Sequence, residues 1–352
     1  MKDAKGIFMR YFSLLFIFIT TTLMAQTQKL TPLSNYKLRN NVKYNDIWGY
    51  TDSKGREYAL LGVRNGTSII QVLDDGSLKP ISFISSNESV WKDIKTYKHY
   101  AYVVNESGGG MQILDLSELP KQVTIAATYT QFQTSHNIYI DEERSLLFAE
   151  GNHSQPVRLL SLADPLRPEQ LTNFGVECHD IFARNGKVYV SEGGHGTIGI
   201  YDYNDPRNVK LLKRHQIKNA GYVHNAWPTD DGKYLMTTEE NTGKTMKMFD
   251  IRDLDNIVLE DEVLAPGRLA HNTHIKGNYA YVSHYGSGLR IYDIGDPKNI
   301  REAAFWQKGE KAQTGFVSNW GAFPFFKSGK IIISDIETGL YVFNFAPSRE
   351  SL

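Results

Sequence analysis

Cysteine is nearly absent from this 352-residue sequence, in which Cys178 stands alone. One thiol excludes an internal disulfide and a CxxC pair, so stability must come from packing. An excess of one charge is also lacking, because 39 basic residues balance 39 acidic ones. That balance argues against a nucleic-acid partner. The sequence also lacks a GxSxG nucleophile elbow, a P-loop and an HExxH helix, so it does not support the enzyme classes that depend on them.

Long apolar runs are confined to the N-terminus. Three basic residues within the first ten precede an apolar stretch at residues 11–24, and small Ala25 then precedes polar Gln26. This layout predicts a signal peptide over residues 1–25 and a secreted protein, extracellular or periplasmic. The alternative is a membrane anchor, but the apolar stretch is shorter than the roughly 20 residues that a bilayer requires. We therefore expect no stable membrane span after cleavage.

A unit of three strands, each pair joined by a short turn, repeats along the rest of the chain. Its clearest copy spans residues 270–300, and a fourth strand follows it at residues 301–307. The third strand of the unit ends in turn at Asp74, Asp115, Ser161, Asp202, Asp250, Asp293 and Asn344. Seven such copies predict an all-β fold, a seven-bladed β-propeller of four-stranded antiparallel blades.

The predicted domain covers residues 26–346 and leaves a short polar tail at residues 347–352. The last repeat lacks a fourth strand, and a ring with an open edge invites wrong pairing. We expect the segment from about Lys29 to Leu38 to add the missing outer strand to the last blade. The alternative is that this segment is a disordered linker.

The first strand of each unit carries a position that differs between blades. It is held in turn by Asn45, Lys92, His136, His179, His224, His271 and Trp320, at steps of 43 to 49 residues. The position that follows is almost always Asp or Asn, and we interpret it as a structural hydrogen-bonding position. Further along the strand, His274 takes the place of an aromatic core residue, which other blades supply as Trp48, Tyr139, Phe182, Trp227 and Phe323.

The second strand ends in acid or imidazole in the same four blades that carry the histidines. The residues are Glu150, Glu192, Glu239 and His284. Two-residue hairpins conserve the sum of paired residue numbers, which predicts three cross-strand pairs. They are His179 with Glu192, His224 with Glu239, and His271 with His284. These side chains should meet in one funnel at the central channel.

Two interpretations of this cluster remain open. In the first, a divalent transition metal such as Zn, Mn, Fe or Cu is the cofactor, and the candidate ligands are His136, His179, His224, His271, His284 and Glu150. Glu192 or Glu239 would then act as general base in a hydrolase, lyase or oxidase. In the second, each pair is a satisfied hydrogen bond between blades.

Other residues at the same face favour a ligand-binding module. Trp91 and Trp320 lie at or beside the variable position and can form a stacking platform, with Lys92 in the position itself and His195 in a glycine-rich loop. The predicted ligand is an extracellular protein, glycan or small molecule, bound by a monomer. A structural scaffold with an inert channel is a third possibility.

Several segments resemble a known family. The LRIYDIGDPKNI and MQILDLSEL segments are similar to LVIVD repeats, and CHDIF, VHNAWPTDDGKYL and NWGAFPF resemble the choice-of-anchor B family of secreted bacterial proteins. The resemblance covers roughly residues 44–345. It implies export and a β-propeller with a variable C-terminal anchoring module, although this sequence ends at Leu352 without an evident anchor. It implies no particular activity.

Overall fold

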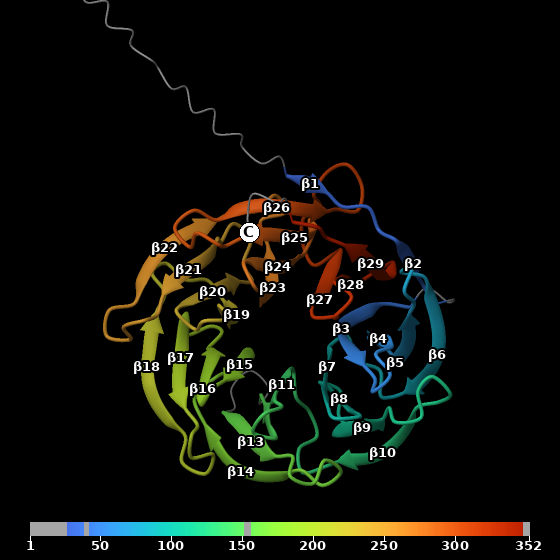
Figure 1. The fold of residues 1–352 in the computed structure, drawn as a ribbon. Helices are drawn as coiled ribbons and strands as arrows, with labels where there is room; N and C mark the ends of the chain where they lie inside the picture. Colours follow the sequence, from blue (N-terminus) through green and yellow to red (C-terminus); the bar gives the residue numbers. More distant parts are fainter. Residues whose placement is uncertain (1–26, 39–41, 151–155, 348–352) are drawn as a thin grey trace, which may run out of the picture.

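The computed structural model describes residues 27–38, 42–150 and 156–347. The predicted signal peptide and all but the first residue of the predicted tail lie outside these residues. Within them the chain is all-β, and seven sheets form a ring around a central axis (Figure 1). We call the region along this axis, between the innermost strands, the channel. No helix of the described residues has the length and apolarity of a membrane span.

Each sheet is one blade of four consecutive antiparallel strands, except where the termini of the domain meet. Blades one to four comprise β3 (Tyr44–Thr51), β4 (Glu57–Val63), β5 (Gly66–Val72), β6 (Leu78–Ser85); β7 (Lys92–Tyr97), β8 (Tyr100–Asn105), β9 (Met111–Asp115), β10 (Thr124–Tyr129); β11 (Ile138–Asp141), β12 (Leu146–Ala149), β13 (Val157–Ser161), β14 (Glu169–Phe174); β15 (Asp180–Arg184), β16 (Lys187–Ser191), β17 (Thr197–Asp202) and β18 (Lys210–Gln216). Blades five to seven comprise β19 (Val223–Pro228), β20 (Tyr234–Glu239), β21 (Met246–Asp250), β22 (Val258–Val263); β23 (Ala270–Lys276), β24 (Tyr279–His284), β25 (Gly288–Asp293), β26 (Arg301–Trp306); β27 (Asn319–Phe323), β28 (Lys330–Asp335) and β29 (Gly339–Asn344). The predicted fold class is confirmed.

The N-terminal segment closes the ring. β2 (Ser34–Tyr36) pairs antiparallel with β29 and supplies the fourth strand of blade seven, as predicted. β1 (Gln28–Lys29) pairs parallel with β26 and adds a fifth strand to blade six, which the sequence did not predict. The innermost strands contact one another in chain order, and β27 contacts β3.

The core lies between neighbouring blades. Inner strands such as β4 and β24 are buried along their whole length, because both faces of each blade pack against another sheet. In outermost strands such as β6 and β18, exposed side chains mix with half-buried ones, because one face of the strand meets solvent. The Asp that ends the third strand has a local role: the Oδ1 atoms of Asp202 and Asp293 accept the N–H two residues further on and start the outer turn.

Candidate functional site

Six aromatic side chains form a closed ring around one end of the channel. They are Trp91, His136, His179, His224, His271 and Trp320, from blades two to seven, and we call them the imidazole–indole ring. The distances between successive ring centroids are 6.5, 4.5, 3.9, 4.3, 5.6 and, from Trp320 back to Trp91, 6.4 Å. In blade one, the Asn45 side chain instead donates to the Val90 carbonyl at 3.0 Å. The variable positions of blades three to seven are therefore contiguous, and Trp91, one residue before the variable position of blade two, closes the ring.

β-Bulges turn two of these histidines toward the channel and overturn two predicted pairs. Glu239 pairs with Val223 rather than with His224, because the register shifts between Val223 and Asn225. His284 pairs with Ala270 rather than with His271, because β23 is irregular there. The hairpin arithmetic assumes regular pairing, and an extra residue in one strand breaks it.

The third predicted pair fails for a related reason. Regular pairing of β15 and β16 begins at Asp180 with Ser191, and the His179 N–H donates to the Ser191 carbonyl at 2.8 Å. The Glu192 carboxylate accepts hydrogen bonds from Thr197, Tyr201 and Arg214, which belong to β17 and β18. It therefore faces the outer strands and not His179.

The second-strand residues lie inside the blades, outside the pocket that the ring borders. Glu239 is fully buried and forms an ion pair with Lys247. Burial raises the pKa of Glu150 well above its usual value, and Asp180, Asp93 and Glu106 raise it further. Burial lowers the pKa of His284 to about 3, and Arg290 adds to the shift. The prediction that these four side chains line the funnel is wrong, since strand alternation directs them away from it.

Four residues of the imidazole–indole ring border a cavity of about 590 Å³, and we call this cavity the upper pocket. Trp91, His136, His179 and Trp320 line it, together with Tyr222, Tyr285 and Phe316. Trp91 is 42% exposed and Phe316 is 64% exposed, so large aromatic faces are open to a ligand.

Two carboxylates that the sequence analysis missed, Glu106 and Glu240, also line the upper pocket. Each directly follows the last residue of a second strand, Asn105 or Glu239. Glu106 Oε1 lies 2.6 Å from His136 Nδ1. Burial raises the pKa of Glu240 to about 7, although His136 and a hydrogen bond with Tyr285 oppose the shift. Glu240 is therefore an acid that changes charge near neutral pH.

Three potential metal ligands converge beside the pocket. Ligand atoms of His179, His224 and Glu240 all lie within 4.8 Å of one another, and His224 Nε2 is 3.8 Å from Glu240 Oε1. Burial, with the neighbouring His179 and His271, lowers the pKa of His224 well below its usual value. A neutral imidazole is the form that binds a metal. Of the predicted ligands, His179 and His224 join this group, while His271 Nδ1 is 2.6 Å from the Trp320 carbonyl.

Two predicted ligand-binding residues lie outside the upper pocket. Lys92 is buried, and its Nζ donates to the Asn87 carbonyl at 2.8 Å, while burial lowers its pKa to about 8. His195 is exposed, and its Nε2 lies 3.8 Å from Glu177 Oε2.

The structural role predicted for the Asp/Asn position, which follows the variable position, is confirmed. The Asp93 carboxylate accepts the Ile138 N–H of the next blade, and the Asn225 amide donates to Asp180 in the neighbouring blade.

Comparison with known proteins supports the fold. The LVIVD repeat family matches residues 267–304. No curated protein sequence matches the chain. Similar solved structures include a putative 6-phosphogluconolactonase from Bacteroides fragilis, with 12% identity over 88% of this chain and 95% of that one and a TM-score of 0.60. The β-propeller domain of Cps50 (Swd1) from Myceliophteria thermophila has 13% identity over 90% and 100%, with a TM-score of 0.62. The WD40 β-propeller domain of Doa1 has 10% identity over 92% and 98%, with a TM-score of 0.63.

The chain is therefore a β-propeller repeat protein. Its identity to the solved propellers is too low to carry over what they act on. The propeller fold is consistent with a binding or scaffold module, and the particular ligand has to be argued from the residues of the upper pocket.

Proposed function

We propose that this propeller is a binding module for an extracellular ligand, and that the upper pocket holds a small molecule or the end of a glycan. The pocket is concave, largely aromatic and carries few polar groups, which is the usual composition of a small-ligand site. Its volume of about 590 Å³ suits such a ligand better than an extended protein surface.

The observation that carries the proposal is the combination of exposed aromatic faces with two acids. Trp91 and Phe316 offer flat apolar surfaces, and the carboxylates of Glu106 and Glu240 can accept hydrogen bonds from hydroxyl or amino groups. A sugar ring presents one apolar face and several hydroxyl groups, so it satisfies both features. Stacking on tryptophan would supply contact area at little cost in conformational entropy.

A glycan array followed by calorimetry on the best ligand tests this proposal. Trp91→Ala should weaken binding at least about tenfold, because it removes the most open indole. Phe83→Ala is the matched control, since Phe83 is 41% exposed on the outer strand of blade one. Equal affinity of both variants and the wild type would place the ligand elsewhere.

Export is part of the proposal. The basic, apolar and small-residue layout of residues 1–25 and the resemblance to the choice-of-anchor B family support a secreted protein, periplasmic or extracellular. N-terminal sequencing of the protein recovered from fractionated cells should find Gln26 as the first residue. An uncleaved chain in the cytoplasmic fraction would contradict export.

A metal-dependent enzyme is the second candidate, favoured by the convergence of His179, His224 and Glu240. Two imidazoles and a carboxylate suit a divalent transition metal, which would act as a Lewis acid. His136 contacts His179 and is held by Glu106, so it is placed to transfer a proton. Glu192 and Glu239 are engaged in ion pairs inside their blades and are not suited to the role of general base.

Elemental analysis separates the two candidates. A metal site predicts stoichiometric metal in the wild type and in His195→Ala, and loss of metal in His224→Ala and Glu240→Gln. His195 is an exposed histidine on the same face and serves as the control. Folded, metal-free wild-type protein after purification without chelators would exclude the metalloenzyme.

A further inference from the structure

A second cavity, of about 520 Å³, lies at the opposite end of the channel, and we call it the lower pocket. The residues that line it come from the last residues of the innermost strands, whereas the imidazole–indole ring comes from the first residues of these strands or from the residues just before them. Residues of the turns that follow these strands, such as Lys98 and Asp230, complete it. The two pockets therefore share the channel but no lining residue.

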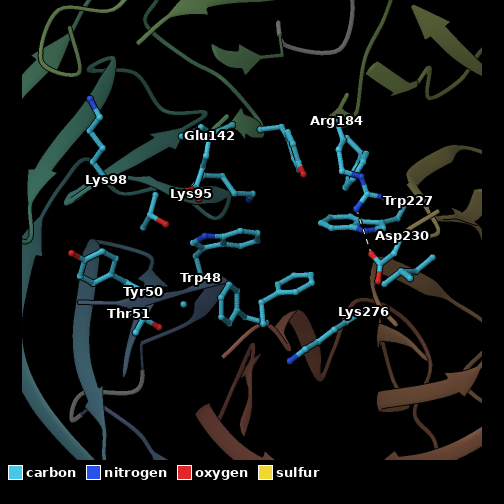
Figure 2. A pocket seen from close by; sticks show the side chains of 18 residues that line it. Trp48, Tyr50, Thr51, Lys95, Lys98, Glu142, Arg184, Trp227, Asp230 and Lys276 are labelled. Atoms are coloured by element: carbon cyan, nitrogen blue, oxygen red, sulfur yellow. Dashed lines mark hydrogen bonds and ion pairs between the residues drawn. The ribbon is translucent and has the colours of Figure 1, made fainter. Parts of the chain in front are cut away.

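Aromatic rings form the walls of the lower pocket. The indoles of Trp48 and Trp227 lie on opposite sides of it (Figure 2). Phe325 borders the same pocket and lies near both indoles, with its ring centroid 6.4 Å from that of Trp48 and 6.0 Å from that of Trp227. The rings of Phe325 and Trp227 are nearly parallel, at 17°. A flat apolar group is the shape that such walls accept best.

The charged groups of the lower pocket favour a negative ligand. Four cations line it, against the two acids Glu142 and Asp230. Asp230 is already 3.4 Å from Arg184, and the Lys95 ammonium lies 2.5 Å from Asp93. The charges that remain are those of the cations Lys98 and Lys276 and of the acid Glu142, which leaves one net positive charge.

Lys276 is the better placed of these two cations. Its ammonium donates to the carbonyls of Pro324 and Phe326, at 2.8 and 3.3 Å, and so lies beside the backbone segment that carries Phe325. Burial lowers the pKa of Lys276, which means that its charge is incompletely solvated. A carboxylate beside it would offset that cost through a charge-assisted hydrogen bond.

We propose that the lower pocket is a second binding site, for aromatic carboxylates. The ring of the ligand would lie between Trp48 and Trp227, and its carboxylate would face Lys276. This site is independent of the upper pocket and of the glycan or small molecule proposed for it, because the two pockets lie at opposite ends of the channel.

Calorimetry with a probe series at pH 7.5 tests the proposal on the full mature chain. The probes are 2-naphthoate, neutral 2-naphthylmethanol and cationic 2-naphthylmethylammonium. The site predicts that naphthoate binds at least about tenfold more tightly than either analogue. Lys276→Gln should weaken naphthoate about tenfold and leave the alcohol unchanged, because only the charge pair is removed. Lys121→Gln, at an exposed lysine outside the pocket, is the control.

Two outcomes of the probe series would decide against the site. Equal affinity for the three probes would show only general apolar binding, and no detectable naphthoate binding would exclude the site outright. Trp91→Ala distinguishes the two pockets: a loss of naphthoate binding in that variant would locate the probe in the upper pocket. Retained binding in Trp91→Ala together with loss in Lys276→Gln is the result that we expect. Failure of the glycan proposal would leave this result untouched.

Discussion

Replacement of His274 by phenylalanine should make the propeller more resistant to acid. His274 is buried among aromatic rings, with its centroid 4.8 Å from that of Trp227 and 6.1 Å from that of Trp48. Burial, aided by the nearby Lys95, lowers the pKa of His274 from 6.5 to about 3. Other blades place an aromatic ring at the equivalent position, so phenylalanine fits the pattern.

The magnitude follows from linkage between protonation and folding. The unfolded chain takes up a proton at His274 below pH 6.5, whereas the folded chain does so only near pH 3. Stability is therefore fully present above pH 6.5 and falls as the pH drops toward 3. At pH 5, 1.5 pH units below the unfolded pKa, the loss is about 2 kcal/mol, at 1.36 kcal/mol per unit.

Urea denaturation at pH 7.5 and pH 5.0 measures this effect. The free energy of unfolding of wild-type protein should fall by about 2 kcal/mol more between the two pH values than that of His274→Phe. Changes at His271 and His284, whose pKa values also fall to about 3, cancel in the comparison. Tyr139→Phe is the control, because it alters the same aromatic layer without removing an imidazole. Parallel pH dependence in wild type and His274→Phe would refute the reasoning.

Three further predictions concern the fold. Gly49→Ala would place a methyl group 2.1 Å from a ring carbon of Phe323, so we expect a loss of about 1–3 kcal/mol in urea denaturation, and unchanged stability would show that the ring can move. Lys95→Met removes the ion pair that compensates buried Asp93 and should cost about 3–5 kcal/mol, much of it restored by adding Asp93→Asn; no recovery in the double variant would assign the cost to packing. Deletion of residues 27–38 leaves the edge of β29 unpaired and should cause aggregation on heating, measured by light scattering, and a monodisperse truncated protein would contradict the closure.

The fold could be predicted because the repeat is local in sequence. The Asp at the end of most third strands, the turns between strands and the alternation of outer strands all act within one blade. Asn185 and Gly186 adopt positive φ values of 54° and 79° in a two-residue turn, which fixes the pairing of Arg184 with Lys187. β1 could not be predicted, because a two-residue exposed strand such as Gln28–Lys29 carries no pattern of its own.

The sequence predicted the aromatic residues of the candidate site but not its acids. A position that varies among otherwise similar blades identified His136, His179, His224, His271 and Trp320, and the structure brings all five into one ring. The same comparison selected Glu192 and Glu239, because they end their strands in regular alignment. The acids that reach the pocket, Glu106 and Glu240, come one residue later.

That displacement by one residue has a physical cause. Each side chain in a β-strand points to the face opposite that of its neighbour, so a shift of one position exchanges the blade interior for the channel. In blade five, Glu239 remains inside with Lys247 while Glu240 reaches His224. The irregular part of β23 contains His271, which contacts the Trp320 carbonyl of the next blade. A repeat unit considered alone contains no information about that neighbour, whereas the imidazole–indole ring is made of contacts between neighbouring blades.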